Sequence, residues 1–365
     1  MKPDRSAHTA NKRSNSRAVI PAILLLMLAL APSAEGDWIN LTGAQNAPNI
    51  AEVYVEKDHV RLVLEIAIED IGTFVGLLPD DFFRDKAVKV PPLAERVRRF
   101  AEEDFQFVTK DAKKLQAKLK LVEPRLRKER PFPFVGAVNP VTGRPIPGPP
   151  KDKRVLYAEL IYPFDSRPDR LTIIPPLGLE GRPAASIGFI AYHEDVPVVD
   201  YRFLPAAAHL HLDWHDPWYS YFEGKALKRW QQSGLMMYLY VEPYEVRHEV
   251  LVRVKDMQSL MDLGLRGKEF IEVDEMDSLK KRIGEFFLEH SKVRIDGKQL
   301  RPILDRTSFV KYTMTRTFFL SQAERMPLNT AMLGIIVTYL TKGIPLPAPC
   351  QSQLTKYGRP VMRVC

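Results

Sequence analysis

The sequence predicts an α+β protein that is mainly β, formed by two tandem homologous antiparallel β domains that resemble sandwiches, each with one amphipathic helix. Three observations predict this fold class: an internal repeat, alternating apolar and polar residues within it, and a helical apolar stripe that follows in both copies. With 365 residues, 45% of them hydrophobic, the chain is long enough for two domains of ~100–200 residues.

The repeat begins at Tyr54 and returns 186 positions later at Tyr240. Eleven identities fall within positions 54–103. In the first copy the identical residues are Tyr54, Val55, Glu56, Val60, Arg61, Asp70, Leu77, Leu93, Arg96, Phe100 and Glu103. Because the register continues without a gap, we interpret the repeat as an internal duplication of one domain.

Each copy begins with a predicted hairpin. Residues 60–68 alternate apolar with mainly polar side chains, and a polar turn at 57–59 joins this half-buried strand to an earlier one. Residues 246–254 keep the same inward-facing positions, and there His248 takes the place of Leu62. We expect His248 to be a hydrogen-bonded histidine of the core.

A capped helix is predicted after each hairpin. Asp70 and Asp256 end the strands, where a carboxylate can accept hydrogen bonds from the first N–H groups of a helical turn. We therefore interpret both residues as N-caps rather than as catalytic carboxylates. The apolar stripe at Leu93–Ala101 and its repeat at Leu279–Phe287 have the i, i+4, i+7, i+8 spacing of an amphipathic helix.

The copies end in further strands and differ by one insertion. A hairpin follows each helix, with the stronger turn signal at Asp296-Gly297, and the late strand at 187–192 matches the strand at 333–339. The first copy contains a Pro-rich insertion at 124–151. Its basic residues are Arg125, Arg127, Lys128, Arg130, Arg144 and Lys151. Because proline lacks an N–H donor, we expect an extended surface loop, with a docking arm as the alternative.

The N-terminus predicts export. Residues 1–17 contain five basic residues, Ala18–Ala31 is apolar, and small residues at Ala34 and Gly36 suit cleavage, as in a signal peptide. The apolar run is shorter than the ~20 residues of a membrane-spanning helix. We therefore expect a periplasmic or extracellular protein, with an uncleaved N-terminal anchor as the alternative.

These features divide the chain into five parts. The predicted organisation is a signal peptide at 1–36, a first β-rich copy at 37–222, a linker at 223–234, a second copy at 235–346 and a tail at 347–365. Proline in that tail, at Pro347 and Pro349, cannot donate to a central sheet. We expect an open edge on the second sheet, unless the segment 209–215 fills it.

The net charge limits which partners we expect, and the positions of the cysteines limit which disulfides can form. The formal net charge of +8 falls to about +5 without residues 1–36, and the basic residues are scattered, so we expect no nucleic acid. A membrane surface and an envelope protein or polymer stay open as partners, and the sequence does not predict the oligomeric state.

Cys350 and Cys365 lie in the tail, so either a late disulfide or two separate thiols would leave the core unaffected.

The most unusual chemistry lies between the copies, at 209–215. If this segment is a strand, its metal-ligating side chains share one face, opposite the apolar ones. The candidate ligands are His209, His211, Asp213 and His215. Imidazole and carboxylate groups bind divalent transition metals such as Zn, Cu or Ni. No standard spacing such as His-Glu-x-x-His accompanies them, so a solvated polar face is the alternative.

No motif identifies a reaction. The sequence contains no Gly-x-Ser-x-Gly elbow, P-loop, Gly-x-Gly-x-x-Gly or Cys-x-x-Cys motif, and no catalytic or cofactor-binding residue is assigned. The adjacent carboxylates Asp80 and Asp81 are expected to be solvated, because no partner base accompanies them.

Four segments of the second copy support a family resemblance. They are the strand ending in Asp256, Leu263-Gly264-Leu265, the helix Leu279–Phe287 and the turn Asp296-Gly297-Lys298-Gln299-Leu300; the first copy has Asp111-Ala112 at that turn. With these segments the unit resembles the extracytoplasmic domain of hydrogenase/urease-accessory-type membrane proteins. The resemblance implies an extracytoplasmic domain without assigned catalytic residues. No membrane helices follow here, so a transport role is not implied.

The function expected from these observations is a non-enzymatic binding or assembly module of the cell envelope, because the residues shared by both copies are strand, cap and core positions. The alternative is a metal-binding protein or metal-dependent enzyme that uses the segment 209–215. A third hypothesis is another, unidentified enzyme.

Overall fold

The protein is mainly β, as predicted: 41% of its residues are in strands and 20% in helices. The computed structural model describes residues 41–84, 90–140, 142–229, 233–312, 317–320, 322–341, 351–354 and 362–363. The chain divides into the units Met1–Trp38 and Ile39–Cys365, and all described residues belong to the second. The predicted signal peptide, Cys350 and Cys365 lie outside the described residues. None of the described helices is long and apolar enough to cross a membrane.

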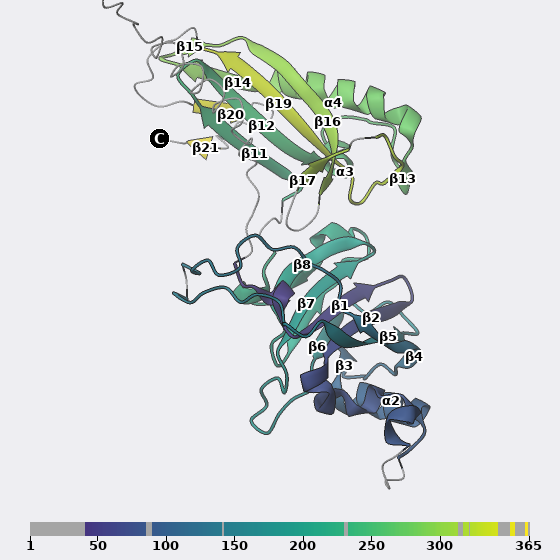
Figure 1. Cartoon of the computed structure of the whole chain (residues 1–365). Helices are drawn as coiled ribbons and strands as arrows, with labels where there is room; N and C mark the ends of the chain where they lie inside the picture. Colours follow the sequence, from purple (N-terminus) through teal and green to yellow (C-terminus); the bar gives the residue numbers. More distant parts are fainter. Residues whose placement is uncertain are drawn as a thin grey trace, which may run out of the picture. The chain divides into compact units, whose positions relative to one another are not determined.

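Two sheets and a helix enclose the core of the first half (Figure 1). One sheet has the strand order β4-β5-β2-β1-β7-β8 and the other β10-β9-β6-β3. The strands are β1 Asn49–Val55, β2 His59–Ala67, β3 Gln106–Thr109, β4 Lys118–Leu126, β5 Arg154–Pro163, β6 Arg170–Ile174, β7 Ile187–His193, β8 Val196–Phe203, β9 Ala208–His211 and β10 Tyr221–Phe222. The helical elements are η1 Ala44–Asn46, η2 Ile68–Leu77, η3 Asp80–Phe83, α2 Leu93–Arg99, the π turn η4 Phe100–Asp104, η5 Pro217–Tyr219 and η6 Lys225–Leu227. Leu62, Phe100 and Ile173 belong to one buried cluster, which both sheets and the α2–η4 segment share.

The second half has a core of its own. Its main sheet has the order β11-β12-β19-β16-β17, and Figure 1 shows helix α4 lying along one face of it. The strands are β11 Leu235–Val241, β12 Glu245–Arg253, β13 Phe270–Ile271, β14 Ser291–Ile295, β15 Lys298–Gln299, β16 Pro302–Tyr312, β17 Thr317–Phe319, β18 Met326–Pro327, β19 Met332–Leu340, β20 Gln351–Leu354 and β21 Met362–Arg363. The helices are α3 Val254–Met257, η7 Val273–Glu275 and α4 Met276–His290. The apolar stripe of α4, with Leu279 and Ile283, packs against Val250 and Val337 of the sheet.

The two main sheets contain the same four-strand unit. β4-β5-β2-β1 in the first sheet and β16-β19-β12-β11 in the second follow the same order, and all neighbours in each set are antiparallel. The registers also agree, since Leu62 faces Leu160 and His248 faces Val337. The irregularities agree as well. The last strand of the unit, β4 or β16, shifts register directly after Leu119, opposite Leu160, and directly after Leu304, opposite Val337.

The repeated surface residues lie opposite each other in this unit. Tyr54 faces Arg61 across β1 and β2, and Tyr240 faces Arg247 across β11 and β12. The guanidinium carbons lie 3.8 and 5.0 Å from the ring centroids, which is the geometry of a cation–π contact. Two of the five identities in the first hairpins are therefore a cross-strand pair on the outer face.

The late strands of the two copies do not match each other in the way that the sequence predicted. β19 was matched with residues 187–192, which form β7, but in the sheet β19 occupies the place of β5. β7 instead joins the other edge of β1, and it does so in parallel. The first sheet is therefore mixed rather than purely antiparallel. The long connection that precedes β7 makes a parallel pairing accessible, which a short hairpin would not.

The second sheet has no counterpart of β7 among the described strands. β11 pairs with β12, and no described strand pairs with its other edge. The alternative that residues 209–215 fill this edge is wrong, because β9 pairs with β6 and β10 in the first half. Part of the tail does form strands: β20 pairs with β14 and β21, not with β11.

The two repeated aspartates are not N-caps. The helical turns start directly after β2 and β12, with Ala67 and Arg253 at the N-cap positions, so Asp70 and Asp256 fall inside the first turn. There the carboxylates still suit the positive end of the turn. Asp70 accepts a hydrogen bond from Asn49 Nδ2 at 2.5 Å, and Asp256 accepts one from Arg253 Nη2 at 2.6 Å.

His248 is buried, as predicted, with 3% of its surface exposed. It is not hydrogen-bonded at Nδ1, which has no partner among the described residues. Burial lowers the pKa of His248 to about 4, from an ordinary value of 6.5. Between these two pH values the unfolded chain binds a proton that the folded chain excludes, so the stability of the fold decreases as the pH falls through this range.

We expect His248→Leu, which copies Leu62, to remove this part of the pH dependence. The free energy of unfolding should fall less between pH 7 and pH 4 than in the unsubstituted protein, by about 3 kcal/mol at most, since one pKa unit corresponds to about 1.4 kcal/mol. Urea denaturation across this pH range measures the effect. His215→Leu, at an exposed position, is the control. Equal pH dependence with and without His248 would contradict the assignment.

Candidate ligand-binding site

A buried cluster of charges lies on the outer face of the first sheet. Arg130, from the connection between β4 and β5, donates to Glu65 Oε2 at 2.7 Å, to Glu52 Oε1 at 3.0 Å and to the Tyr201 hydroxyl at 2.9 Å. The side chains of Arg130 and Glu65 are each 8% exposed. Alternation along β1 and β2 places Glu52 and Glu65 on the face away from the core, and Arg130 provides the charge that their burial requires.

The groups of this cluster shift one another's pKa values. Burial acts to raise the pKa of Glu52, but the hydrogen bonds from Arg130 and Tyr54 outweigh it and hold this pKa below its ordinary value. Burial acts to lower the pKa of Arg130, and the hydrogen bond to Glu65 together with the neighbouring charges raises it instead. Burial raises the pKa of Tyr201 to about 12. At neutral pH the Arg130 guanidinium therefore lies between the ionised carboxylate of Glu52 and the neutral phenol of Tyr201.

This cluster fastens the segment 127–153 to the sheet. The backbone N–H of Lys128 donates to Glu65 Oε1 at 2.9 Å, so the same carboxylate holds both the backbone and Arg130. The expected surface loop thus has an ordered start. Further along, Gly136 and Ile146 are joined by a 2.9 Å backbone hydrogen bond, which closes a small hairpin within the segment.

The turn η1 forms the opposite wall. Gln45 Nε2 donates to the Pro131 carbonyl at 3.3 Å, and Asn46 Nδ2 donates to the Pro147 carbonyl at 2.9 Å. η1 can lie against β7 because residue 188 is glycine: a Cβ there would be 1.9 Å from the Ala44 carbonyl oxygen.

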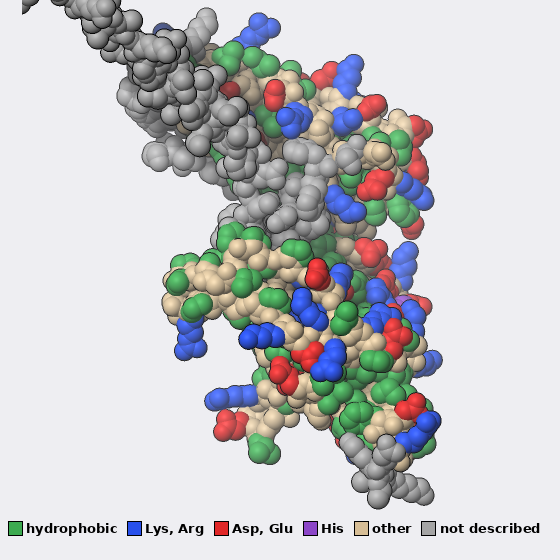
Figure 2. All heavy atoms as spheres, in the orientation of Figure 1, with side chains coloured by type: hydrophobic (Ala, Val, Ile, Leu, Met, Phe, Trp, Pro, Cys, Tyr) green, Lys and Arg blue, Asp and Glu red, His purple; other side chains and the backbone are tan. Residues whose placement is uncertain are grey.

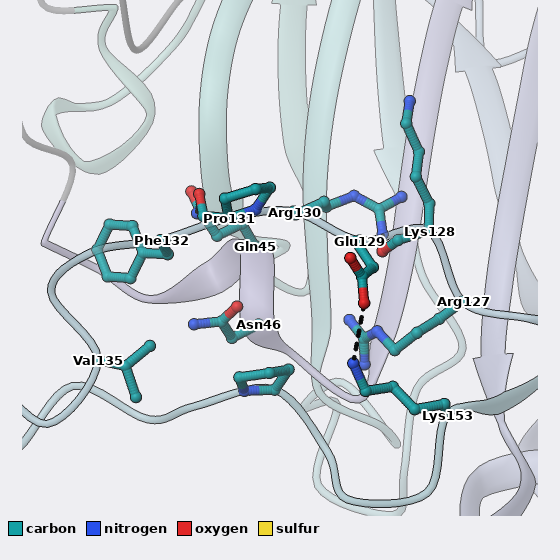
Figure 3. A pocket seen from close by; sticks show the side chains of 11 residues that line it. Gln45, Asn46, Arg127, Lys128, Glu129, Arg130, Pro131, Phe132, Val135 and Lys153 are labelled. Carbon is teal, nitrogen blue, oxygen red and sulfur yellow. Dashed lines mark hydrogen bonds and ion pairs between the residues drawn. The ribbon is translucent and has the colours of Figure 1, made fainter.

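A cavity of about 310 Å³ lies between η1 and the segment 127–153 (Figure 3). Its lining has a polar, mostly basic side and an apolar side. The lining residues are Gln45, Asn46, Arg127, Lys128, Glu129, Arg130, Pro131, Phe132, Val135, Pro149 and Lys153. Glu129 is the one carboxylate among them, and it pairs with Lys153 at 3.7 Å. Concave sites of this size that combine apolar walls with a few polar groups are typical of small-ligand binding.

Arg127 is the lining residue with unused hydrogen-bonding capacity. The residue is 7% exposed, and its Nη2 donates to the Ala47 carbonyl at 3.0 Å. Its Nη1 is buried and has no hydrogen-bond partner among the described residues. Burial lowers the pKa of Arg127, and the nearby charge of Glu65 offsets this only in part.

A second cavity, of about 300 Å³, shares Lys128 and Arg130 with the first. It lies over β1, β2 and β5, and Arg61, Arg125 and Tyr157 contribute to its lining. Figure 2 shows basic and acidic side chains interspersed over the lower part of the view, which contains the first sheet. The two cavities flank the point at which Arg130 is held.

The candidate metal ligands do not share one strand face. β9 ends at His211, and Asp213 lies in a turn where its Oδ1 accepts from the N–H groups of His215 and Asp216, both at 2.9 Å. That local hydrogen bonding replaces the predicted strand after residue 211. Only His209 and His211 keep the expected alternation. Among the described residues, no group of three or more His, Cys, Asp or Glu side chains is placed to hold a metal ion.

His209 and His211 each have a protein partner. His209 Nδ1 lies 3.0 Å from Thr172 Oγ1, and His211 Nε2 lies 2.6 Å from Glu223 Oε1. The hydrogen bond from His211 lowers the pKa of Glu223. The aspartates of the acidic pair are also engaged, since Asp80 forms an ion pair with Arg96 and Asp81 pairs with Arg84.

The sequence indicated the basic residues of the cavity but not their role. Arg127, Lys128 and Arg130 were recognised as part of a Pro-rich insertion and interpreted as a surface loop. The signal that could have identified the cluster was Glu65, a carboxylate on the outer face of a strong strand pattern, opposite a segment rich in arginine. The sequence alone did not predict the pairing, because Arg130 contacts Glu65 and Glu52, which lie 65 and 78 positions away in the sequence.

No protein-family model, curated protein or solved structure matches the chain. The site is therefore interpreted from its own geometry.

Proposed function

We propose that this protein is a non-enzymatic binding module of the cell envelope, exported by its N-terminal segment, and that the cavity beside Arg127 holds its ligand. The observation that supports the proposal most directly is a hydrogen-bonded cavity whose wall contains a buried guanidinium, that of Arg127, with no ion pair to any described side chain and no hydrogen-bond partner for Nη1 among them. Buried charges are normally paired, so the cavity is incomplete without a ligand.

We also propose that the two halves arose by duplication of one domain. The shared four-strand order, the equal register and the bulge at the same place support this origin. The resemblance to the extracytoplasmic domain of hydrogenase/urease-accessory-type membrane proteins fits an exported module and stays a prediction.

Filling the cavity tests the binding function. Val135 lines the cavity and is 48% exposed, so Val135→Trp should occupy the space while the fold tolerates the larger ring. Val138→Trp, in the same hairpin but outside the lining and 65% exposed, is the matched control. The mature protein is purified gently from the envelope of cells that export it, and native mass spectrometry measures bound small molecules.

We expect a bound mass on the unsubstituted protein and on Val138→Trp, and its loss from Val135→Trp. An adduct that is unaffected by Val135→Trp, or a protein without any adduct, would contradict the proposal. Equal melting temperatures of the two tryptophan variants confirm that the difference comes from the cavity.

A second candidate function is metal binding through the segment 209–215. The supporting observation is that His211 Nε2 lies 2.6 Å from Glu223 Oε1, which places an imidazole beside a carboxylate. Metal analysis of the mature protein tests this candidate. Stoichiometric Zn, Cu or Ni that is lost in His209→Ala plus His211→Ala would favour it, whereas metal-free protein under Zn-replete conditions would eliminate it.

A further inference from the structure

We infer that the ligand of this cavity is a small organic carboxylate with an apolar group, and that Arg127 is its charged anchor. The inference rests on the proposed function, because it assigns a chemical class to the ligand of the same cavity. Three features support it: the unsatisfied guanidinium, the charge of the lining and the apolar wall.

The guanidinium of Arg127 requires an anion. It forms no ion pair with any described side chain, in contrast to Arg130, which is bound by both Glu52 and Glu65. A buried cation without a counter-charge is costly, and a carboxylate that receives a charge-assisted hydrogen bond from it removes that cost. The free Nη1 therefore indicates an acceptor with negative charge.

Lys153 provides a second positive charge. Its pairing with Glu129 is long, at 3.7 Å, and the two side chains are 47% and 84% exposed. Such an exposed pair contributes little stability, so an incoming carboxylate can replace Glu129 as the partner of Lys153. Figure 3 labels this pair and Arg127, and all three residues line the same cavity. The cavity therefore offers a ligand carboxylate two cations.

The other side of the cavity is apolar. Phe132, Val135 and Pro149 line it, and Figure 3 shows Phe132 and Val135 on the side opposite Lys153. A ligand that places its carboxylate at Arg127 therefore directs its remaining atoms toward carbon surfaces. The volume of about 310 Å³ suits a compact ligand such as a single ring with a short acid.

A carboxylate fits the donor set better than a phosphate. One guanidinium nitrogen of Arg127 lacks a partner among the described residues and Arg130 is already satisfied, whereas phosphate sites usually combine several donors from arginine clusters or from backbone N–H groups. A singly charged carboxylate is also cheaper to bury than a dianion.

Titration calorimetry of the mature protein tests the assignment with three probes: phenylacetate, the neutral isostere phenylacetamide, and inorganic phosphate. We expect phenylacetate to bind at least tenfold more tightly than phenylacetamide and phosphate. Arg127→Gln should weaken phenylacetate binding by about tenfold to a hundredfold, as for loss of a charge-assisted hydrogen bond. Lys151→Gln, an exposed position of the same segment outside the lining, should leave binding unchanged.

Lys153→Gln keeps the inference testable if Arg127→Gln does not fold, and it should weaken phenylacetate binding severalfold. Phenylacetamide or phosphate binding as tightly as phenylacetate, or equal phenylacetate affinity in both lysine variants, would overturn the carboxylate assignment. If Val135→Trp removes a co-purified ligand while no carboxylate probe binds, the ligand class is wrong and the binding function stands. If neither occurs, both are wrong.

Discussion

The site depends on one buried interaction, the contact of Arg130 with Glu52 and Glu65. The segment from β4 to β5 is rich in proline and cannot build a ladder with the sheet. It is held instead by side chains, and Arg130 reaches two strands at once. Breaking a buried ion pair by removing one partner typically costs about 3–5 kcal/mol, because the remaining charges stay buried. The contact of Arg130 with Glu52 and Glu65 therefore holds in place the segment that forms one wall of the cavity.

The shared four-strand unit and the cavity are separate parts of the first half. All residues that line the cavity beside Arg127 lie outside β1, β2, β4 and β5. They belong to η1, which packs on β7, and to the connection between β4 and β5. Under the proposed duplication, the first half gained this cavity through what was added around the unit. The second half, whose β11 edge has no described partner strand, retains the plainer arrangement.

Local sequence patterns predicted the strands and helices. The features that the sequence did not predict depend on contacts between residues far apart in the chain. The alternation of Val60, Leu62, Leu64 and Ile66 predicted β2, and the stripe from Leu279 to Phe287 predicted α4, because burial of one face follows directly from spacing. The N-caps at Asp70 and Asp256 were wrong because the helical turns are capped at Ala67 and Arg253, three residues earlier than predicted. The place of β19 could not be read from sequence similarity, since β5 and β7 are both apolar strands. The cavity could not be predicted from the sequence because Arg130 and Glu52, which contact each other, are 78 positions apart.

The central claim is that Arg130 fixes the wall of the cavity, and hydrogen exchange of Arg130→Met measures this most directly. The account predicts faster exchange of the amides at 127–153, with protection of β12 and β19 unchanged, because the second core does not depend on this contact. Arg125→Met is the control, since Arg125 is exposed and lies over the Tyr157 ring at 3.8 Å. Unchanged protection of residues 127–153 in Arg130→Met would contradict the account.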